Sequence, residues 1–361
     1  MATTKLSHGS ALIRSDYLLL GGCVAATVLA GVTRYTGGGD VLAFACSALA
    51  VALLASLVGL SVEQLGDRFG PGATGVLQSA LGNLPELFIA LFALKAGLVA
   101  VVQAALIGSI LANLLLVMGL CFVVGGLKHG PQNLDSGRAR DSTVLMVLSV
   151  VALVLPSLAS YVHSPAEPHE RTLSMIVSVV LLLLFLLTLP ASLKRTAGKR
   201  EEIEQEPPRW PLALAVGLLA LAALAAAFVS DWFVHALEPA MHTLGISDMF
   251  AGLVVVAIAG NAIENVVGIQ LAAAGRSEYA YSVVINSPLQ IALVLAPLLV
   301  ILSQTLGFSP LTLVFPPMLV VSVALAVIVA AFITFDGESN WIEGAALIAV
   351  YAIIAAAFWW G

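Results

Sequence analysis

Long apolar runs without a charged residue are the feature that most limits what this chain can fold into. Residues 41–60 (VLAFACSALAVALLASLVGL) and 175–193 (MIVSVVLLLLFLLTLPASL) are each long enough to cross a hydrocarbon layer of about 30 Å as a helix. The 361-residue chain is 60% hydrophobic and only 10% charged, with a mean hydropathy of +1.04. Because no soluble domain could bury that much apolar surface, the sequence predicts an all-α integral membrane protein.

The apolar runs also predict how many helices cross the membrane and in which direction. Eleven segments qualify as transmembrane helices, at residues 16–33, 40–62, 72–94, 99–126, 142–162, 172–193, 210–230, 248–273, 279–304, 310–334 and 341–360. With the N-terminus in the cytoplasm, 12 of the 15 lysines and arginines fall in inside loops. Because such residues favour the cytoplasmic side, we expect a cytoplasmic N-terminus and an outside C-terminus in a bacterial inner (plasma) membrane.

A polar linker divides the chain into two halves. Residues 1–35 supply one extra N-terminal helix, residues 36–193 a first half of five helices, and residues 210–361 a second half of five. The linker, residues 194–209, carries an acidic cluster made of Glu201, Glu202, Glu204 and Glu206. Two interpretations of this cluster stay open, a solvated cytosolic loop and a regulatory segment that attracts cations.

A repeated motif relates the two halves. GNLPEL begins at Gly82 and GNAIEN begins at Gly260, an offset of 178 (260 − 82) that persists without a gap through both following spans. Five spans separate the copies, and because five is odd the copies run through the membrane in opposite directions. The sequence therefore predicts two inverted five-helix repeats with broken helices at the centre, an architecture typical of secondary transporters.

Two glutamates in these motifs, Glu86 and Glu264, are the principal candidate ligands. A charged group at the bilayer centre costs roughly 2.5–3.5 kcal/mol, and neither repeat has a lysine or arginine in its interior to pair with it. Further oxygen ligands are expected from Asn83, Asn261, Ser109, Asn113, Ser287 and Gln290. Oxygen donors without thiolate or histidine suit a hard cation such as Ca²⁺. Since two carboxylates neutralise one Ca²⁺ or hold two protons, the set predicts exchange of one for the other.

Other polar residues near the spans are secondary candidates. Glu63 and Asp231 are candidates for a vestibule or a proton path, as are Asn265 and Asn286 beside the second motif. No phosphate-binding loop, phosphorylation motif or zinc-protease motif occurs, so we expect neither an enzyme nor a cofactor. Nothing in the charge pattern suggests a nucleic acid partner.

With these motifs, the sequence resembles the Ca²⁺/cation antiporter superfamily, in its Ca²⁺/H⁺ exchanger branch. The matching segments are GNLPE at 82–86, GSILAN at 108–113, GNAIE at 260–264, NSPLQI at 286–291, EQL at 63–65, SD at 230–231 and DGESNWIEG at 336–344. The resemblance implies eleven spans, an acidic segment between the halves, and Glu86 and Glu264 as the main cation ligands.

The chain departs from that branch at three positions. Asn265 stands where the branch usually has histidine, Asn286 where it usually has glycine, and Pro85 resembles the Na⁺/Ca²⁺ exchangers. We predict a Ca²⁺/H⁺ antiporter that works by alternating access in the lipid bilayer. Na⁺-coupled Ca²⁺ exchange, Na⁺/H⁺ exchange through the same site, and a cation channel remain alternatives, and an oligomer is compatible with the sequence.

Overall fold

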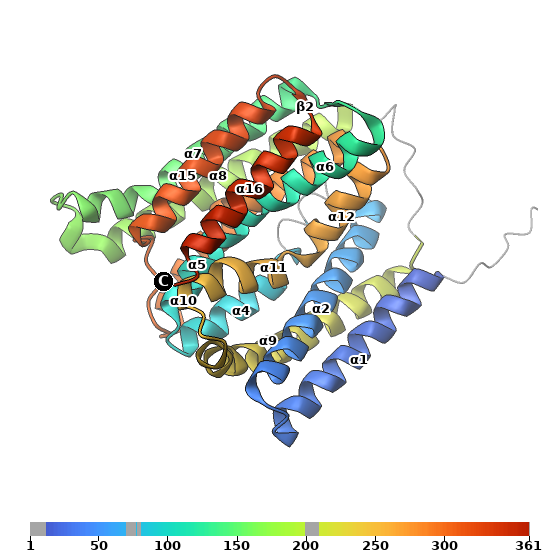
Figure 1. The fold of residues 1–361 in the computed structure, drawn as a ribbon, viewed down its shortest axis with the longest axis vertical. Helices are drawn as coiled ribbons and strands as arrows, with labels where there is room; N and C mark the ends of the chain where they lie inside the picture. The colour runs from blue at the N-terminus through green and yellow to red at the C-terminus, as the bar shows by residue number, and fades with distance from the viewer. Residues whose placement is uncertain (1–11, 70–76, 78–80, 199–208, 361) are drawn as a thin grey trace, which may run out of the picture.

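The protein folds into a bundle of long helices (Figure 1), and the computed structural model describes residues 12–69, 77, 81–198 and 209–360. The first part contains α1 (Arg14–Thr36), α2 (Asp40–Phe69), α4 (Leu84–Lys95), α5 (Val99–Leu111), η1 (Ala112–Val117), α6 (Met118–His129), α7 (Ser136–Tyr161), η2 (Glu167–His169) and α8 (Glu170–Gly198). The second part contains α9 (Leu212–Leu244), α10 (Asp248–Phe250), η3 (Ala251–Val256), α11 (Ala257–Gly260), α12 (Ala262–Ala273), α13 (Ser277–Gln290), η4 (Ile291–Leu295), α14 (Ala296–Thr305), α15 (Pro317–Thr334) and α16 (Trp341–Ala357). A two-residue strand pair, β1 (Gln132–Asn133) with β2 (Glu338–Ser339), joins two loops.

The helical class predicted from the sequence is confirmed. Among the described residues, eight helices are long and apolar enough to cross a membrane, and a bent pair, 248–260 with 264–273, raises the number to nine. The third predicted span, 72–94, is described only at residue 77 and from residue 81 onward. The total of eleven spans therefore stays a prediction.

Helix α9 is longer than the sequence indicated. We expected a span over 210–230, but the helix continues to Leu244. Its polar residues beyond 230 recur at helical spacing on one face, while Phe233, Leu237 and Met241 on the other face are buried. Asp231 and Glu63 thus lie within helices α9 and α2 rather than beyond their ends.

The start of the predicted span 310–334 is wrong, because residues 310–316 are not helical and α15 begins only at Pro317. Prolines at 316 and 317 cannot donate backbone hydrogen bonds, which disfavours a helix before them. Side chains from four helices bond this extended segment instead: Gln103 donates to the carbonyls of Thr312 and Val314, Ser157 bonds Leu313 and Phe315, and Ser174 and Ser303 accept from the amides of Leu313 and Leu311.

The two halves have matching element bounds at the offset of 178. Helix α4 covers 84–95 and α12 covers 262–273, while α5 begins at Val99 and α13 at Ser277. The π-helical turn η1 (112–117) similarly matches η4 (291–295). The hydrogen bonds from Gln103 to the carbonyls of Thr312 and Val314 have a counterpart in the second half. Tyr281 matches Gln103 at the offset of 178, and its hydroxyl lies 3.4 Å from the carbonyl oxygen of Ala139 near the start of α7.

Helices α4 and α12 extend from the centre toward opposite ends of the molecule (Figure 1). Helix α4 ends at Lys95, just before α5, η1 and α6 form one apolar span of 31 residues, Val99–His129. Helix α12 ends at the far end of that span, where the carbonyl oxygen of Ala273 lies 3.1 Å from both Lys128 Nζ and His129 Nε2. The centre of the bundle therefore lies between two short helices that point apart.

A buried polar junction fixes the start of α9 against α1 and α2. Asp16, only 2% exposed, accepts hydrogen bonds from the Arg209 guanidinium (3.3 Å) and the Trp210 indole (3.1 Å). Gln64 on α2 accepts from both of their backbone amides, at 3.0 and 3.1 Å. This junction immediately follows the predicted acidic linker, whose residues Glu201, Glu202, Glu204 and Glu206 lie outside the described residues.

Candidate functional site

The chain breaks its helical path at the two Gly-Asn pairs, and each break positions a glutamate. Asn83 and Asn261 precede the first residues of α4 and α12 with nearly the same backbone, φ −94° and ψ 19° against φ −91° and ψ 24°. The second break bends the helix pair by 62°. Glu86 and Glu264 each lie in the first turn of the helix that follows, where free amides and the helix dipole favour negative charge.

The two glutamates approach each other across the centre. Glu86 is 8% and Glu264 6% exposed, and Glu86 reaches the break that lies just before Glu264. Glu86 packs on the second break so closely that a Cβ at Gly260 would lie 2.5 Å from Glu86 Cγ. Within the described residues, Glu86 Oε1 and Glu264 Oε2 have no hydrogen-bond partner, and no salt bridge joins either group to a base. Two buried acids therefore lie at the centre without a basic partner among the described residues.

Asn261 organises the polar residues around one of the two breaks. Its amide nitrogen donates to Ser109 Oγ at 2.8 Å, and its amide oxygen accepts from Asn113 Nδ2 at 2.7 Å and from Ser287 Oγ at 3.0 Å. Asn113 also donates to the carbonyl of Ser109, at 2.9 Å. Four predicted ligands from α5, η1, α13 and the second break thus form one buried network.

Asn83, the counterpart of Asn261, is not held in this way. Its side-chain oxygen is buried, and the described residues offer it no hydrogen-bond partner. The offset of 178 pairs Asn113 with Ile291, so the second half has an alkyl group where the first half supplies an amide. The first break therefore has an unpartnered oxygen beside Glu86, whereas the amide oxygen of Asn261 is already occupied.

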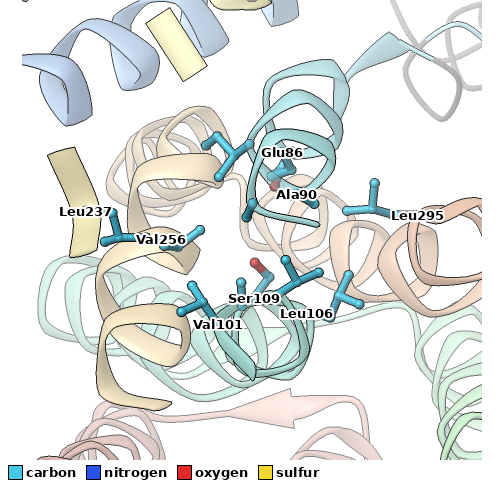
Figure 2. A pocket seen from close by; sticks show the side chains of 12 residues that line it. Glu86, Ala90, Val101, Leu106, Ser109, Leu237, Val256 and Leu295 are labelled. Carbon is cyan, nitrogen blue, oxygen red and sulfur yellow. The ribbon is translucent and has the colours of Figure 1, made fainter. Parts of the chain in front are cut away.

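A cavity lies against Glu86 and Ser109, between α4, α5, η3 and α9 (Figure 2). It offers about 20 Å³ to the centres of water molecules, where roughly 10–15 Å³ is enough for one. Its lining is apolar except for these two residues, with Ala93, Val101, Leu237 and Val256 among the others. Such walls disfavour a hydrated ion.

No hydrogen bond described above joins the remaining predicted residues to this network, and they differ in how far they are buried. Gln290 and Asn265 are half-buried, and the oxygen of Asn265 is buried with no described partner. Asn286 and Glu63 are exposed, on α13 and α2. Asp231 is half-buried, and its Oδ1 lies 3.5 Å from His235 Nδ1 one turn away.

Glycines make contributions that the sequence analysis did not assign to individual residues. Gly260 lets Glu86 reach the second break, and a Cβ at Gly108 would lie 2.3 Å from the carbonyl oxygen of Leu253 on η3. Both glycines belong to the repeated motifs. The signal that could have found them is the position of each glycine directly beside a predicted ligand, where only a residue without Cβ allows such a close approach.

The donor set is suited to a hard cation as cargo. The described residues contain no group of three or more histidine, cysteine, aspartate or glutamate side chains that could hold a metal. Two carboxylates with amide and hydroxyl oxygens are instead available, and Ca²⁺ accepts such oxygen ligands in flexible geometry.

Comparison with known proteins shows which family the chain belongs to. The family model for sodium/calcium exchanger proteins matches residues 40–194 and 214–360, which include both Gly-Asn breaks and both glutamates. The chain belongs to this family. The exchanger is thus a membrane transporter and not an enzyme, and the resemblance inferred from its motifs is confirmed.

The exchanger is similar to named bacterial relatives over most of its length. It is 38% identical to a Ca²⁺/H⁺ antiporter of Synechocystis sp., with 91% of this chain and 94% of that protein covered. It is 37% identical to the Ca²⁺/H⁺ antiporter ChaA of Bacillus subtilis, over 87% and 91%. The solved structure of native YfkE superposes with a TM-score of 0.81 at 33% identity, covering 94% of this exchanger and 99% of that chain.

Proposed function

We propose that this exchanger moves Ca²⁺ and protons in opposite directions, with Glu86 and Glu264 binding either one Ca²⁺ or protons. The observation that carries the proposal is the meeting of two buried carboxylates, from oppositely directed helices, without a basic partner among the described residues. The names of relatives 37–38% identical, both Ca²⁺/H⁺ antiporters, support it.

Competition for the same oxygens couples the two flows. Two ionised carboxylates buried side by side are costly, because each loses its hydration and repels the other. Bound Ca²⁺ removes this cost, and so do protons, whereas the empty charged site is disfavoured. The site therefore releases Ca²⁺ when protons replace it and releases protons when Ca²⁺ returns, so no separate coupling residue is needed.

Alternating access follows from the placement of the glutamates on two oppositely directed half-helices. The apolar cavity beside Glu86 closes one approach to the site, while the α13 face next to Ser287 carries the exposed Asn286. Exchange then requires a conformational change that opens the closed side of the site and closes the open side. The proposal includes a cytoplasmic N-terminus, an outside C-terminus and a bacterial inner membrane, supported by the distribution of lysine and arginine.

Flux measurements on purified protein in proteoliposomes test the proposal directly. With a proton gradient and no Na⁺, we expect Ca²⁺ uptake that collapses when the gradient is dissipated, and Ca²⁺ addition should in turn drive protons across the membrane. Uptake that ignores the proton gradient but follows a Na⁺ gradient would establish the Na⁺-coupled alternative. Passive Ca²⁺ flux without counter-movement of any cation would establish a channel.

A further inference from the structure

The cavity beside Glu86 follows one face of α4 (Figure 2). Glu86, Ala90 and Ala93 are spaced at i, i+4 and i+7, so they lie along that face over roughly 10 Å of helix. On α5, Ala105 and Ser109 belong to the opposite wall and lie four residues apart. Only Glu86 and Ser109 bring polar side chains to the cavity, and the rest of its lining is alkyl.

The two polar residues lie at the same end of the cavity, because both contact the second break. A Cβ at Gly260 would lie 2.5 Å from Glu86 Cγ, and the neighbouring Asn261 donates to Ser109 Oγ at 2.8 Å. The lining farther along α4 is apolar and buried, with Ala93 only 1% exposed. A ligand that fits this cavity is therefore polar at one end and apolar at the other.

The matching place in the second half is packed. Gly268 is the counterpart of Ala90, and a Cβ there would lie 2.9 Å from Val284 Cγ2 on α13. Val284 is itself the counterpart of Leu106, which lines the cavity. The repeated backbone does not by itself leave such a space, so the cavity beside Glu86 is a feature of the first half.

The polar end offers acceptors to a positively charged donor. Glu86 Oε1 is buried, and it has no hydrogen-bond partner and no salt bridge among the described residues. Ser109 Oγ keeps a second lone pair beside the one that accepts from Asn261. An ammonium group has three donors and a positive charge, so it can bond both oxygens, whereas a water molecule leaves the carboxylate charge unbalanced.

The volume of the cavity limits the size of the ligand. About 20 Å³ is open to the centres of water molecules, where roughly 10–15 Å³ holds one, so there is room for about two heavy atoms. The alkyl walls disfavour a hydrated ion but suit an alkyl group. A methyl or ethyl group attached to the ammonium therefore matches the space beside Ala90 and Ala93.

We propose that this cavity binds a small primary alkylammonium ion, with its ammonium group on Glu86 and Ser109 and its methyl or ethyl group between α4 and α5. The ion competes with Ca²⁺ because both need the oxygens of Glu86, so it inhibits exchange. The inference rests on the proposed function in one respect, that the site opens to water and a cation can reach Glu86. It does not depend on which ions are exchanged.

A series of alkylammonium chlorides tests the proposal on full-length protein in detergent without Ca²⁺. Methylammonium and ethylammonium should raise the melting temperature, because they bind the folded state. The longer n-butylammonium and tetramethylammonium, which has no N–H donor, should not. At ten times its dissociation constant, methylammonium should raise the Ca²⁺ concentration for half-maximal stabilisation about tenfold.

Two results of this series would overturn the proposal. Partitioning into detergent alone would make the effect grow with every added carbon, with no limit at short chains. An absence of stabilisation by methylammonium and ethylammonium would show that the cavity holds only water. Glu86→Gln should abolish the effect of both ions, since it removes the negative charge, and a variant that responds like the parent would contradict the assigned contact.

Filling the cavity should remove the response to alkylammonium ions and keep the response to Ca²⁺. Ala93→Leu and Ala105→Val introduce the residues that the second half has at the offset of 178, Leu271 and Val283. Ala100→Val is the matched control, because Ala100 also lies on α5 but is not among the residues that line the cavity. Filled variants that respond to methylammonium as the parent does would refute the proposed site.

Enlarging the cavity keeps the test decisive if the filled variants do not fold. Leu106→Ala removes a lining side chain, and n-butylammonium should then raise the melting temperature although it does not do so in the parent. An unchanged limit in chain length would overturn the proposal. Failure of Ca²⁺/H⁺ exchange with alkylammonium binding intact would change only the proposed ions, whereas normal exchange without that binding would remove this inference alone.

Discussion

The two Gly-Asn breaks have almost the same backbone but opposite side-chain environments. Asn261 is fixed by hydrogen bonds to Ser109, Asn113 and Ser287, so its amide is part of the scaffold. Asn83 has a buried oxygen with no partner among the described residues, and it lies three residues before Glu86. The comparison teaches that an internal repeat can preserve its backbone while the matching side chains of its two copies find different partners among the described residues.

The largest effect is expected from the glutamates, where the two halves should behave alike. Glu86→Gln and Glu264→Gln keep nearly the same volume and an oxygen, but each removes one charge and one proton site. Either change should abolish Ca²⁺-driven proton movement in proteoliposomes. Folding should survive, because a neutral amide costs less to bury than an unpaired carboxylate.

The control for this experiment is the yield and melting temperature of each variant beside the parent. Added Ca²⁺ should raise the melting temperature of the parent but not of either Gln variant, since only a ligand bound to the folded state stabilises it. For the parent, this stabilisation should weaken as pH falls, because protons compete for the same oxygens. Near-normal exchange by both Gln variants would contradict the mechanism.

A smaller effect should separate Asn261 from Asn83. Asn261→Ala removes three buried hydrogen bonds, to Ser109, Asn113 and Ser287, each with a net worth of about 0.5–1.5 kcal/mol, so a large fall in melting temperature is expected. Asn83→Ala removes no described hydrogen bond of its side-chain oxygen. It should leave the melting temperature nearly unchanged while weakening the apparent Ca²⁺ affinity. Equal loss of stability in the two variants would break the comparison.

The third prediction tries to make the two halves alike. Ile291→Asn introduces an amide at the counterpart of Asn113, and by the repeat we expect it to donate to Asn83 Oδ1, which has no partner among the described residues. If that oxygen is a ligand, Ca²⁺ affinity should fall by about threefold to tenfold, the effect of one net hydrogen bond of about 1 kcal/mol. Ile291→Val serves as the matched control, because it shortens the side chain without adding a donor. Unchanged affinity in the Asn variant would show that Asn83 does not bind the cation.

The smallest effect is expected from Gln103 on α5 and Tyr281 on α13, whose side chains bond neighbouring segments. Gln103→Leu leaves the carbonyls of Thr312 and Val314 without their donor, so the free energy of unfolding should fall by about 1–3 kcal/mol. Tyr281→Phe removes a contact of 3.4 Å to the Ala139 carbonyl and the hydroxyl's interactions with Thr143 and Thr334. It should cost about 1 kcal/mol or less, because the two threonine hydroxyls can bond each other. Thermal unfolding in one detergent measures both, and a larger loss in the tyrosine variant would reverse this ranking of the halves.

Much of this architecture was predictable because it is encoded by spacing. Apolar length predicted the helices, and the offset of 178 predicted matching elements whose bounds now agree at α4 and α12. Residues 310–316 have the apolar composition of a helix, and the prolines at 316 and 317 are the signal that could have shown otherwise. Side chains distant in the sequence, such as Gln103 and Ser157, also bond the extended backbone, and one sequence gives no sign of such contacts.

The candidate site shows the same limit. The motifs predicted which residues gather at the centre, including Asn261, Ser109 and Ser287. They did not predict which asparagine is bonded and which is free, because that depends on the partner that each finds across the repeat. Ile291 is the counterpart of Asn113 in the repeat and has no amide. The effect of this difference on the two asparagines becomes visible only when both residues are placed around the breaks.

The extended segment at residues 310–316 has a consequence for how the protein is made. Each helix that bonds it, through Gln103, Ser157, Ser174 or Ser303, precedes it in the chain and is therefore synthesised first. An unpaired backbone group in lipid costs several kcal/mol, so the segment cannot rest in the bilayer on its own. We therefore expect ordered insertion, in which α15 and α16 pack only after α5, α7, α8 and α14 are in place.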